Sequence, residues 1–159
     1  MRKVRTMVVA LAAVFALGIA WATPAMATQH GTSTGSWSHA GGSATASVFT
    51  NEFGAPYFGD KDGTVVFSRS GGVEFWVNFD YVRLYRNGVQ VQANNADQYR
   101  VIAGGFQVST PRHIRNCSSG TGTYYTIARY QFTHAADGHV SGWITRQSGS
   151  WTDTSDCSD

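Results

Sequence analysis

Residues 73–93, which read VEFWVNFDYVRLYRNGVQVQA, decide the fold class of this chain. From Val73 to Phe79 apolar and polar side chains alternate, which is the period of a β-strand with one buried face. Asn87-Gly88 then separates two further alternating runs, and this dipeptide favours the positive φ angles of a two-residue hairpin turn. The stretch therefore predicts two antiparallel strands joined by a tight turn.

A two-residue turn fixes the register of this hairpin, because each residue before the turn then faces one residue after it. The predicted pairs are Arg86 with Val89, Leu84 with Val91, and Val82 with Ala93. The apolar members of these pairs fall on one face. The buried positions change from odd numbers at Phe79 to even numbers at Val82, which predicts a β-bulge near Asp80 and Tyr81.

Short runs of the same kind, separated by turn residues, continue through the rest of the chain. We expect further strands at residues 44–49, 64–68, 99–102, 106–109, 123–133 and 140–146, with a last short one near 150–152. Residues 28–42 are mostly Gly, Ser and Thr, so we expect a loose arm with at most one short strand there. Seven to nine short strands predict an all-β fold, either a small antiparallel β-sandwich or a barrel.

The composition after residue 27 agrees with this fold class. All three Met precede that point, and beyond it the chain has one Leu, two Glu and one Lys, which are residues that fill helices. The five Trp, seven Tyr and nine Phe almost all lie in the later part, where they can build a core. This usage excludes a helical protein, and it also excludes a disordered one.

The first 27 residues have the three parts of a secretory signal peptide. Three cations stand within residues 1–5, an apolar stretch covers residues 7–22, and residues 25–27 (AMA) offer small side chains to the signal peptidase. A membrane-spanning helix needs about 20 apolar residues, more than this stretch has. We expect cleavage after Ala27, with Ala22 as the alternative. Residues 28–159 would then be a single all-β domain of a secreted, extracellular protein.

Charge and motifs restrict the partners. The whole chain has a formal net charge of +2, and loss of three signal-peptide cations leaves the exported part at −1. No run of Lys or Arg is present, so we expect no nucleic-acid partner. We also expect no membrane contact after cleavage. No phosphate-binding loop is present, and we expect no cofactor.

Cys117 and Cys157 are the two cysteines of the chain. An even pair in an exported protein normally forms a disulfide. Neither belongs to a Cys-x-x-Cys motif or to a zinc-ligand spacing, so we expect a structural bridge instead of a redox or metal role.

Residues 134–139 (HAADGH) contain the most suggestive group of polar side chains. His134, Asp137 and His139 surround one tight turn and could converge on a metal ion. Their spacing matches no established zinc or facial-triad pattern, so we favour a solvated hairpin turn without metal. His39 and His113 are isolated in the sequence, and we expect surface or structural histidines there.

Other polar stretches offer weaker chemistry. Residues 60–63 (DKDG) resemble the start of a calcium loop, but the later oxygen ligands are missing, so we favour a polar turn before a strand. A glycosidase would need two facing carboxylates. The candidates are Glu52 and Glu74, joined by Asp80 or Asp97, and we expect Glu74 to be solvent-exposed and structural. No nucleophile elbow is present.

Two aromatic side chains are candidates for ligand binding. Trp76 lies on the polar face of its predicted strand, and Tyr85 lies on the hairpin face that also carries Arg83. Aromatic rings displayed on a sheet can stack on sugars or anchor a protein.

The sequence therefore predicts a secreted, non-catalytic β-domain that binds extracellular polysaccharide, cell-wall material or a protein partner. The rival hypothesis is a small secreted hydrolase with its site around the His134–His139 turn. An open row of aromatic rings would favour the binding protein, whereas titratable groups converging in a pocket would favour the enzyme.

Overall fold

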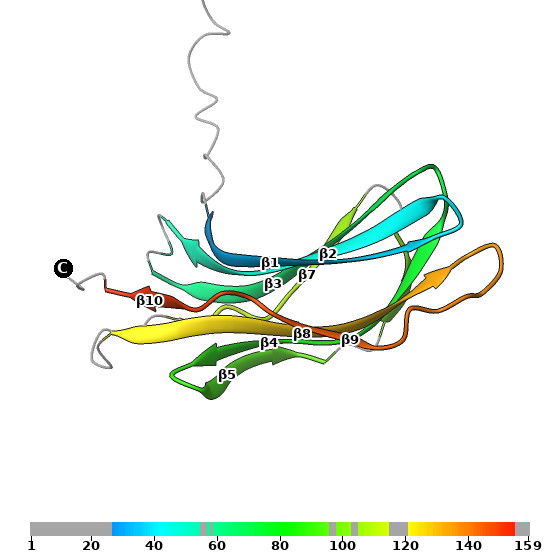
Figure 1. Ribbon diagram of the computed structural model, residues 1–159. Coiled ribbons are helices and arrows are strands. Elements are labelled where there is room, and N and C mark those ends of the chain that lie inside the picture. The colour runs from blue at the N-terminus through cyan, green and yellow to red at the C-terminus, as the bar shows by residue number, and fades with distance from the viewer. Residues whose placement is uncertain are drawn as a thin grey trace, which may run out of the picture.

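The computed structural model describes residues 27–54, 57, 59–95, 98–102, 105–114 and 121–154 of the chain. These residues form two antiparallel sheets, seen as two layers in Figure 1. The four-stranded sheet has the order β1 (Ala27–His39), β2 (Gly42–Phe53), β3 (Lys61–Ser70), β7 (Phe106–Ser109). The predicted all-β class is confirmed.

The second sheet has six strands. Its main path is β10 (Trp151–Asp153), β8 (Gly122–His134), β4 (Phe75–Arg86), β5 (Val89–Asn94), while β6 (Gln98–Val101) pairs with β4 and β9 (Ile144–Gln147) pairs with β8. The long strands β4 and β8 run side by side through its middle and carry most of its buried side chains.

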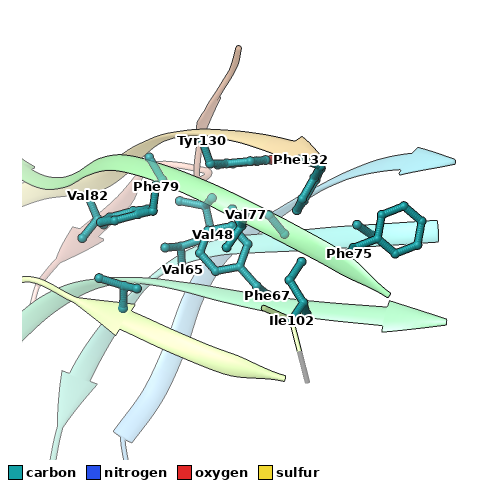
Figure 2. Close-up of a cluster of buried hydrophobic side chains, with 14 residues drawn as sticks. Val48, Val65, Phe67, Phe75, Val77, Phe79, Val82, Ile102, Tyr130 and Phe132 are labelled. Carbon is teal, nitrogen blue, oxygen red and sulfur yellow. The ribbon is translucent and has the colours of Figure 1, made fainter. Parts of the chain in front are cut away.

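One apolar core lies between the two sheets, and both contribute to it. Phe67 of β3 is fully buried, and its ring meets Phe79, Tyr130 and Phe132 of the other sheet edge-on at 5.4–6.2 Å between ring centroids. Figure 2 shows these rings together with the valines that fill the space around them. Aromatic side chains therefore fill much of the core volume that leucine fills in most proteins, as the composition predicted.

The β4–β5 hairpin turns at the predicted dipeptide. Asn87 and Gly88 have φ angles of 50° and 81°, and Arg86 pairs with Val89. Farther from the turn the predicted register is wrong by one residue. An irregularity between Leu84 and Tyr85 adds one residue to β5, so Leu84 pairs with Gln92 instead of Val91. Val89, next to the turn, is 66% exposed.

The other features of β4 and β8 follow the predicted pattern. The β4–β8 register shifts between Phe79 and Tyr81, which confirms the bulge. Alternate residues of β8 are buried from Gly122 to His134. The predicted return strand at residues 140–146 is shorter than expected, because Val140 makes one isolated bridge to Thr133 and β9 begins only at Ile144.

Residues 28–42 are not the loose arm that their composition predicts. They include most of β1, which pairs with β2 from Ala27 to His39. The sequence lacks an apolar alternation there because β1 is an edge strand, and most of its side chains face solvent while its backbone is held by β2. Trp37 is its main contribution to the core.

Several predictions fall on other parts of the chain. The signal peptide up to Met26, Cys117, Cys157 and Asp97 lie outside the described residues. Among the described residues, no helix has the length and apolar character needed to cross a membrane.

Candidate functional site

The outer side of the six-stranded sheet carries a set of aromatic rings. Strand alternation sends the side chains next to each buried residue of β4 and β8 to this side. We name this surface the aromatic face. Its rings are Trp76, Tyr81, Tyr85, Tyr99, Tyr125 and Trp143. Both predicted binding residues, Trp76 and Tyr85, belong to it and are half-buried.

Four rings of the aromatic face stack in two pairs. Tyr85 and Tyr125 lie directly opposite each other on β4 and β8, and their rings stack with centroids 5.0 Å apart and an interplanar angle of 3°. Trp76 stacks on Tyr99 of β6 at 4.8 Å, and its indole N–H donates to the Glu74 carboxylate. Rings fixed in this way lose little further freedom when a ligand binds.

Arginine side chains separate the two ring pairs. The Arg83 guanidinium lies 3.8 Å above the ring of Tyr81, and the Arg129 guanidinium lies 4.7 Å from the ring of Trp143. Arg129 also donates to Asp80 at 3.0 Å. Asp80 is therefore part of a surface ion pair with Arg129.

A second group of functional side chains lies where the β1–β2 turn meets the turn after β8. We name His39, His134 and Asp137 the His–Asp cluster. Asp137 Oδ1 accepts hydrogen bonds from His134 Nδ1 at 2.7 Å and from the His139 backbone N–H at 3.0 Å. Its Oδ2 accepts from His39 Nε2 at 2.8 Å, so one carboxylate joins two imidazoles.

Stacked rings hold the cluster from one side. His139 stacks on His39 with centroids 4.5 Å apart, and Trp37 stacks on His39 at 5.5 Å. On the inner side the ring of Phe75 meets His134 edge-on at 5.6 Å. The cluster therefore spans from the solvent-exposed turn to the edge of the core.

Hydrogen bonds determine the charge of Asp137. The His139 backbone N–H, and then the two imidazoles, hold the pKa of the Asp137 carboxyl well below its ordinary value. Because the ionised carboxylate only accepts, the proton of His134 lies on Nδ1. The Nε2 atom of His134 is buried and has no hydrogen-bond partner among the described residues.

The donor set of the cluster is two imidazoles and one carboxylate, which is the ligand set of several zinc and iron sites. One ligand atom from each residue lies within 4.8 Å of the others. Ligands of a single zinc ion lie within about 4 Å of each other, so a small contraction would let the three hold one ion.

A shallow hollow of about 440 Å³ lies beside the cluster over the β1–β2 turn. It is open to solvent, and serine and glycine residues form most of its wall. Of the three cluster residues only His39 lines it. Of the titratable groups in the cluster, His39 alone therefore faces this open hollow.

The structure corrects several predictions about histidines. His134 is 4% exposed and does not belong to a solvated turn, because it continues the buried alternation of β8. His39 is not isolated, since strand pairing brings it to Asp137 across 98 positions of sequence. His139, which was considered as a metal ligand but not favoured, contributes a backbone N–H and a stacked ring.

His113 forms a backbone bridge to Lys61 and lies near the ring of Tyr124. Burial lowers the pKa of its imidazole, and the cations Arg86 and Lys61 lower it further. A structural role fits these contacts, as predicted.

Residues 60–63 are neither a calcium loop nor a solvated turn. Residues 61–63 begin β3 and are buried. The Asp62 carboxylate accepts hydrogen bonds from Asn51 and Thr64, both at 2.9 Å, and burial raises its pKa. Asp62 instead belongs to a buried hydrogen-bond network between β2 and β3.

Glu52 and Glu74 lie at opposite ends of the molecule. Glu52 pairs across β2 and β3 with Lys61, whereas Glu74 precedes Phe75, which lies at the other end of β2 beside Gly42. Glu74 is exposed, as predicted. The two glutamates therefore cannot act on one glycosidic bond.

When it was compared with known proteins, the chain matched no family model, no curated protein and no solved structure.

Proposed function

We propose that this protein is a secreted, non-catalytic binding domain, and that its aromatic face binds extracellular polysaccharide. The observation that supports the proposal is the set of six rings on one side of the six-stranded sheet, four of them stacked in two pairs and the other two packed against arginine. Sugar rings present C–H groups that pack on aromatic surfaces and hydroxyl groups that hydrogen-bond to guanidinium and amide groups.

The neighbouring polar side chains suit the same ligand. Asn78 and Gln131 face each other on β4 and β8 between the two ring pairs, and both are half-buried. Amides can donate and accept at once, as sugar hydroxyls do. A sheet face of this kind is open along its length, so it favours a long chain over a small molecule enclosed in a pocket.

Export and the cysteine bridge are part of the proposal. Cleavage after Ala27 would release a chain that begins one residue into β1, and intact mass of the secreted protein tests it. A product that retains Met1 would contradict export by cleavage. A Cys117–Cys157 bridge predicts no reactive thiol in the denatured, unreduced protein, and two titratable thiols would disprove it.

We also infer a β-sandwich over a closed barrel. In the described part of the chain, no ladder of strand pairs joins the four-stranded sheet to the six-stranded sheet. Two open sheets with a shared core are the arrangement of a sandwich.

The binding proposal is tested by sedimentation of the purified protein with insoluble polysaccharides and cell-wall fractions. We expect Trp76→Ala and Tyr85→Ala each to weaken binding at least fivefold, because each removes one ring of a stacked pair. The matched control is Tyr57→Ala, which removes a tyrosine that is 43% exposed and packs against Arg112 elsewhere. Equal binding by all four proteins, or capture of a protein alone from the fractions, would contradict the proposal.

A metal-dependent hydrolase is the second candidate, favoured by the approach of three ligand atoms within 4.8 Å in the His–Asp cluster. This function predicts that zinc binds the purified protein in calorimetry and that His39→Ala and His134→Ala each abolish the binding. It also predicts a hydrolytic activity that chelation removes. Polysaccharide binding that survives both variants and chelation, with no activity detected, would favour the binding domain.

A further inference from the structure

Among the residues that the structure describes, the most deeply buried charged side chain lies at the end of the molecule opposite the His–Asp cluster. Lys61 begins β3, and its side chain is 1% exposed. Lysine is almost never buried to this extent unless its ammonium group has a partner. The surroundings of its Nζ atom therefore decide what this residue does.

Three groups surround Nζ. It donates to Asp153 Oδ2 at 2.6 Å and to the Gly59 carbonyl at 2.6 Å, and Glu52 Oε1 lies 3.8 Å away. Asp153 is also buried, with its side chain 8% exposed. An amine and a carboxyl group are thus in contact, with a second carboxylate beside them.

Aromatic rings enclose this contact. Nζ lies 5.0 Å from the ring centre of Tyr124 and 5.3 Å from that of Trp151. His30 stacks on Trp151 at 3.9 Å and contacts Glu52 Oε2 at 3.3 Å, so it covers the outer side. An ion pair placed among rings has lost much of its hydration, and conversion into a neutral pair removes two buried charges.

We propose that Lys61 and Asp153 condense to form an intramolecular isopeptide bond. A proton passes from the Lys61 ammonium to the Asp153 carboxylate, which leaves a neutral amine beside a neutral acid. The amine nitrogen attacks Cγ of Asp153, loses a further proton, and the acid's hydroxyl group leaves as water. Ammonium plus carboxylate give one amide and one water, so atoms and charge balance without an oxidant or an activated donor.

Glu52 is the proton carrier for this step. Its Oε1 lies 3.8 Å from Nζ, so one bridging water or an approach of less than about 1 Å lets it take the proton that nitrogen loses on attack and return it to the departing hydroxyl group. The fold holds the reacting groups in contact, so the entropy cost of bringing them together has already been met when the chain folds. The rings then restrict the access of water that would reverse the reaction.

The bond would join the two sheets at one end. Lys61 belongs to the four-stranded sheet, and Asp153 belongs to β10 at the edge of the other sheet. Strand β10 has three residues and pairs with β8 over those three alone. A covalent link would fasten this short last strand, which its few hydrogen bonds hold weakly.

The test is the mass of the full chain, expressed with secretion, then reduced and alkylated, with its amino terminus determined by peptide sequencing. Loss of one water lowers the intact mass by about 18 Da relative to the sequence. Trypsin should then fail to cut after Lys61, and peptide 147–159 should appear joined to the peptide that contains Lys61. An intact mass equal to that of the sequence, with free peptides 62–69 and 147–159, would overturn the proposal.

Variants locate the bond. Lys61→Arg and Asp153→Ala should each restore the full mass expected of their sequences, and Glu52→Gln should leave most of the chain unlinked. Asp80→Ala is the matched control, because Asp80 contacts a cation on the outer surface, and it should keep the deficit of one water. A deficit that persists in Lys61→Arg would place the lost water elsewhere and refute the assignment.

Discussion

Gly63 of β3 faces Thr126 of β8 across the core, and replacing this glycine by alanine tests how the two sheets meet. A Cβ atom at residue 63 would lie 2.8 Å from both Cγ2 and Oγ1 of Thr126. Ordinary contacts between such atoms begin at about 3.5 Å, so the methyl group overlaps two atoms at once. Thr126 cannot turn away freely, because its hydroxyl forms a buried 2.9 Å hydrogen bond with Thr50.

The expected cost of Gly63→Ala is about 2–3 kcal/mol of unfolding free energy. Overpacking of a dense core costs about 1–3 kcal/mol, and a buried hydroxyl that loses its partner adds about 1 kcal/mol or more. The better strand propensity of alanine returns about 0.5 kcal/mol. For a domain of this size the melting temperature should fall by about 10 °C.

Urea unfolding of a double-mutant cycle measures the contact itself. Thr126→Ala removes both overlapping atoms, so Gly63→Ala should cost little in that background, and the coupling energy should be about 2 kcal/mol. Additive effects of the two substitutions would mean that these positions are not in contact. That result would contradict the packing of β3 against β8 at Gly63 and Thr126.

Three further outcomes follow from single residues. Gly88→Val should cost about 1–2 kcal/mol in urea unfolding, because residue 88 has a φ of 81° and a β-branched side chain resists positive φ; an unchanged midpoint would contradict this. Burial raises the pKa of Asp62, so its carboxyl favours folding at low pH and loses that effect as pH rises through the folded pKa. Asp62→Asn should therefore stabilise the protein more at pH 7 than at pH 3, measured by urea unfolding at both. The pKa of Asp137 is lowered, so its contribution is fully present at neutral pH and declines as pH falls below the ordinary pKa of the carboxyl toward the folded pKa. Asp137→Ala should lower the melting temperature more at pH 7 than at pH 3, and an equal change at both would refute the assigned ionisation.

Local pattern alone predicted the centre of the six-stranded sheet. The alternation along β4, the Asn87-Gly88 turn and the buried face of β8 are all properties of neighbouring residues, and the structure confirms them. The outward position of Trp76 and Tyr85 follows from the same alternation, which is why these two candidates were found before the fold was known.

The structure at edge strands and irregular positions could not be predicted from the local apolar pattern. Strand β1 is held by the backbone of β2, so its side chains need no apolar period and give no signal. The β4–β5 register shifts where one extra residue enters β5, and the apolar pattern favoured the register without that residue. Residues 61–63 look like a solvated turn because all of them are polar or glycine, yet they are buried.

The sequence by itself therefore determined the fold class, the main hairpin and the ring-bearing face, because strand period and turn chemistry act between near neighbours. Tertiary structure alone decided the two clusters of charged side chains. His39 reaches Asp137 because the β1–β2 turn lies beside the turn after β8. Lys61 reaches Asp153 because β10 pairs with the beginning of β8, and this pairing places Asp153 beside the start of β3. Such contacts join residues about 100 positions apart, and no local period records them.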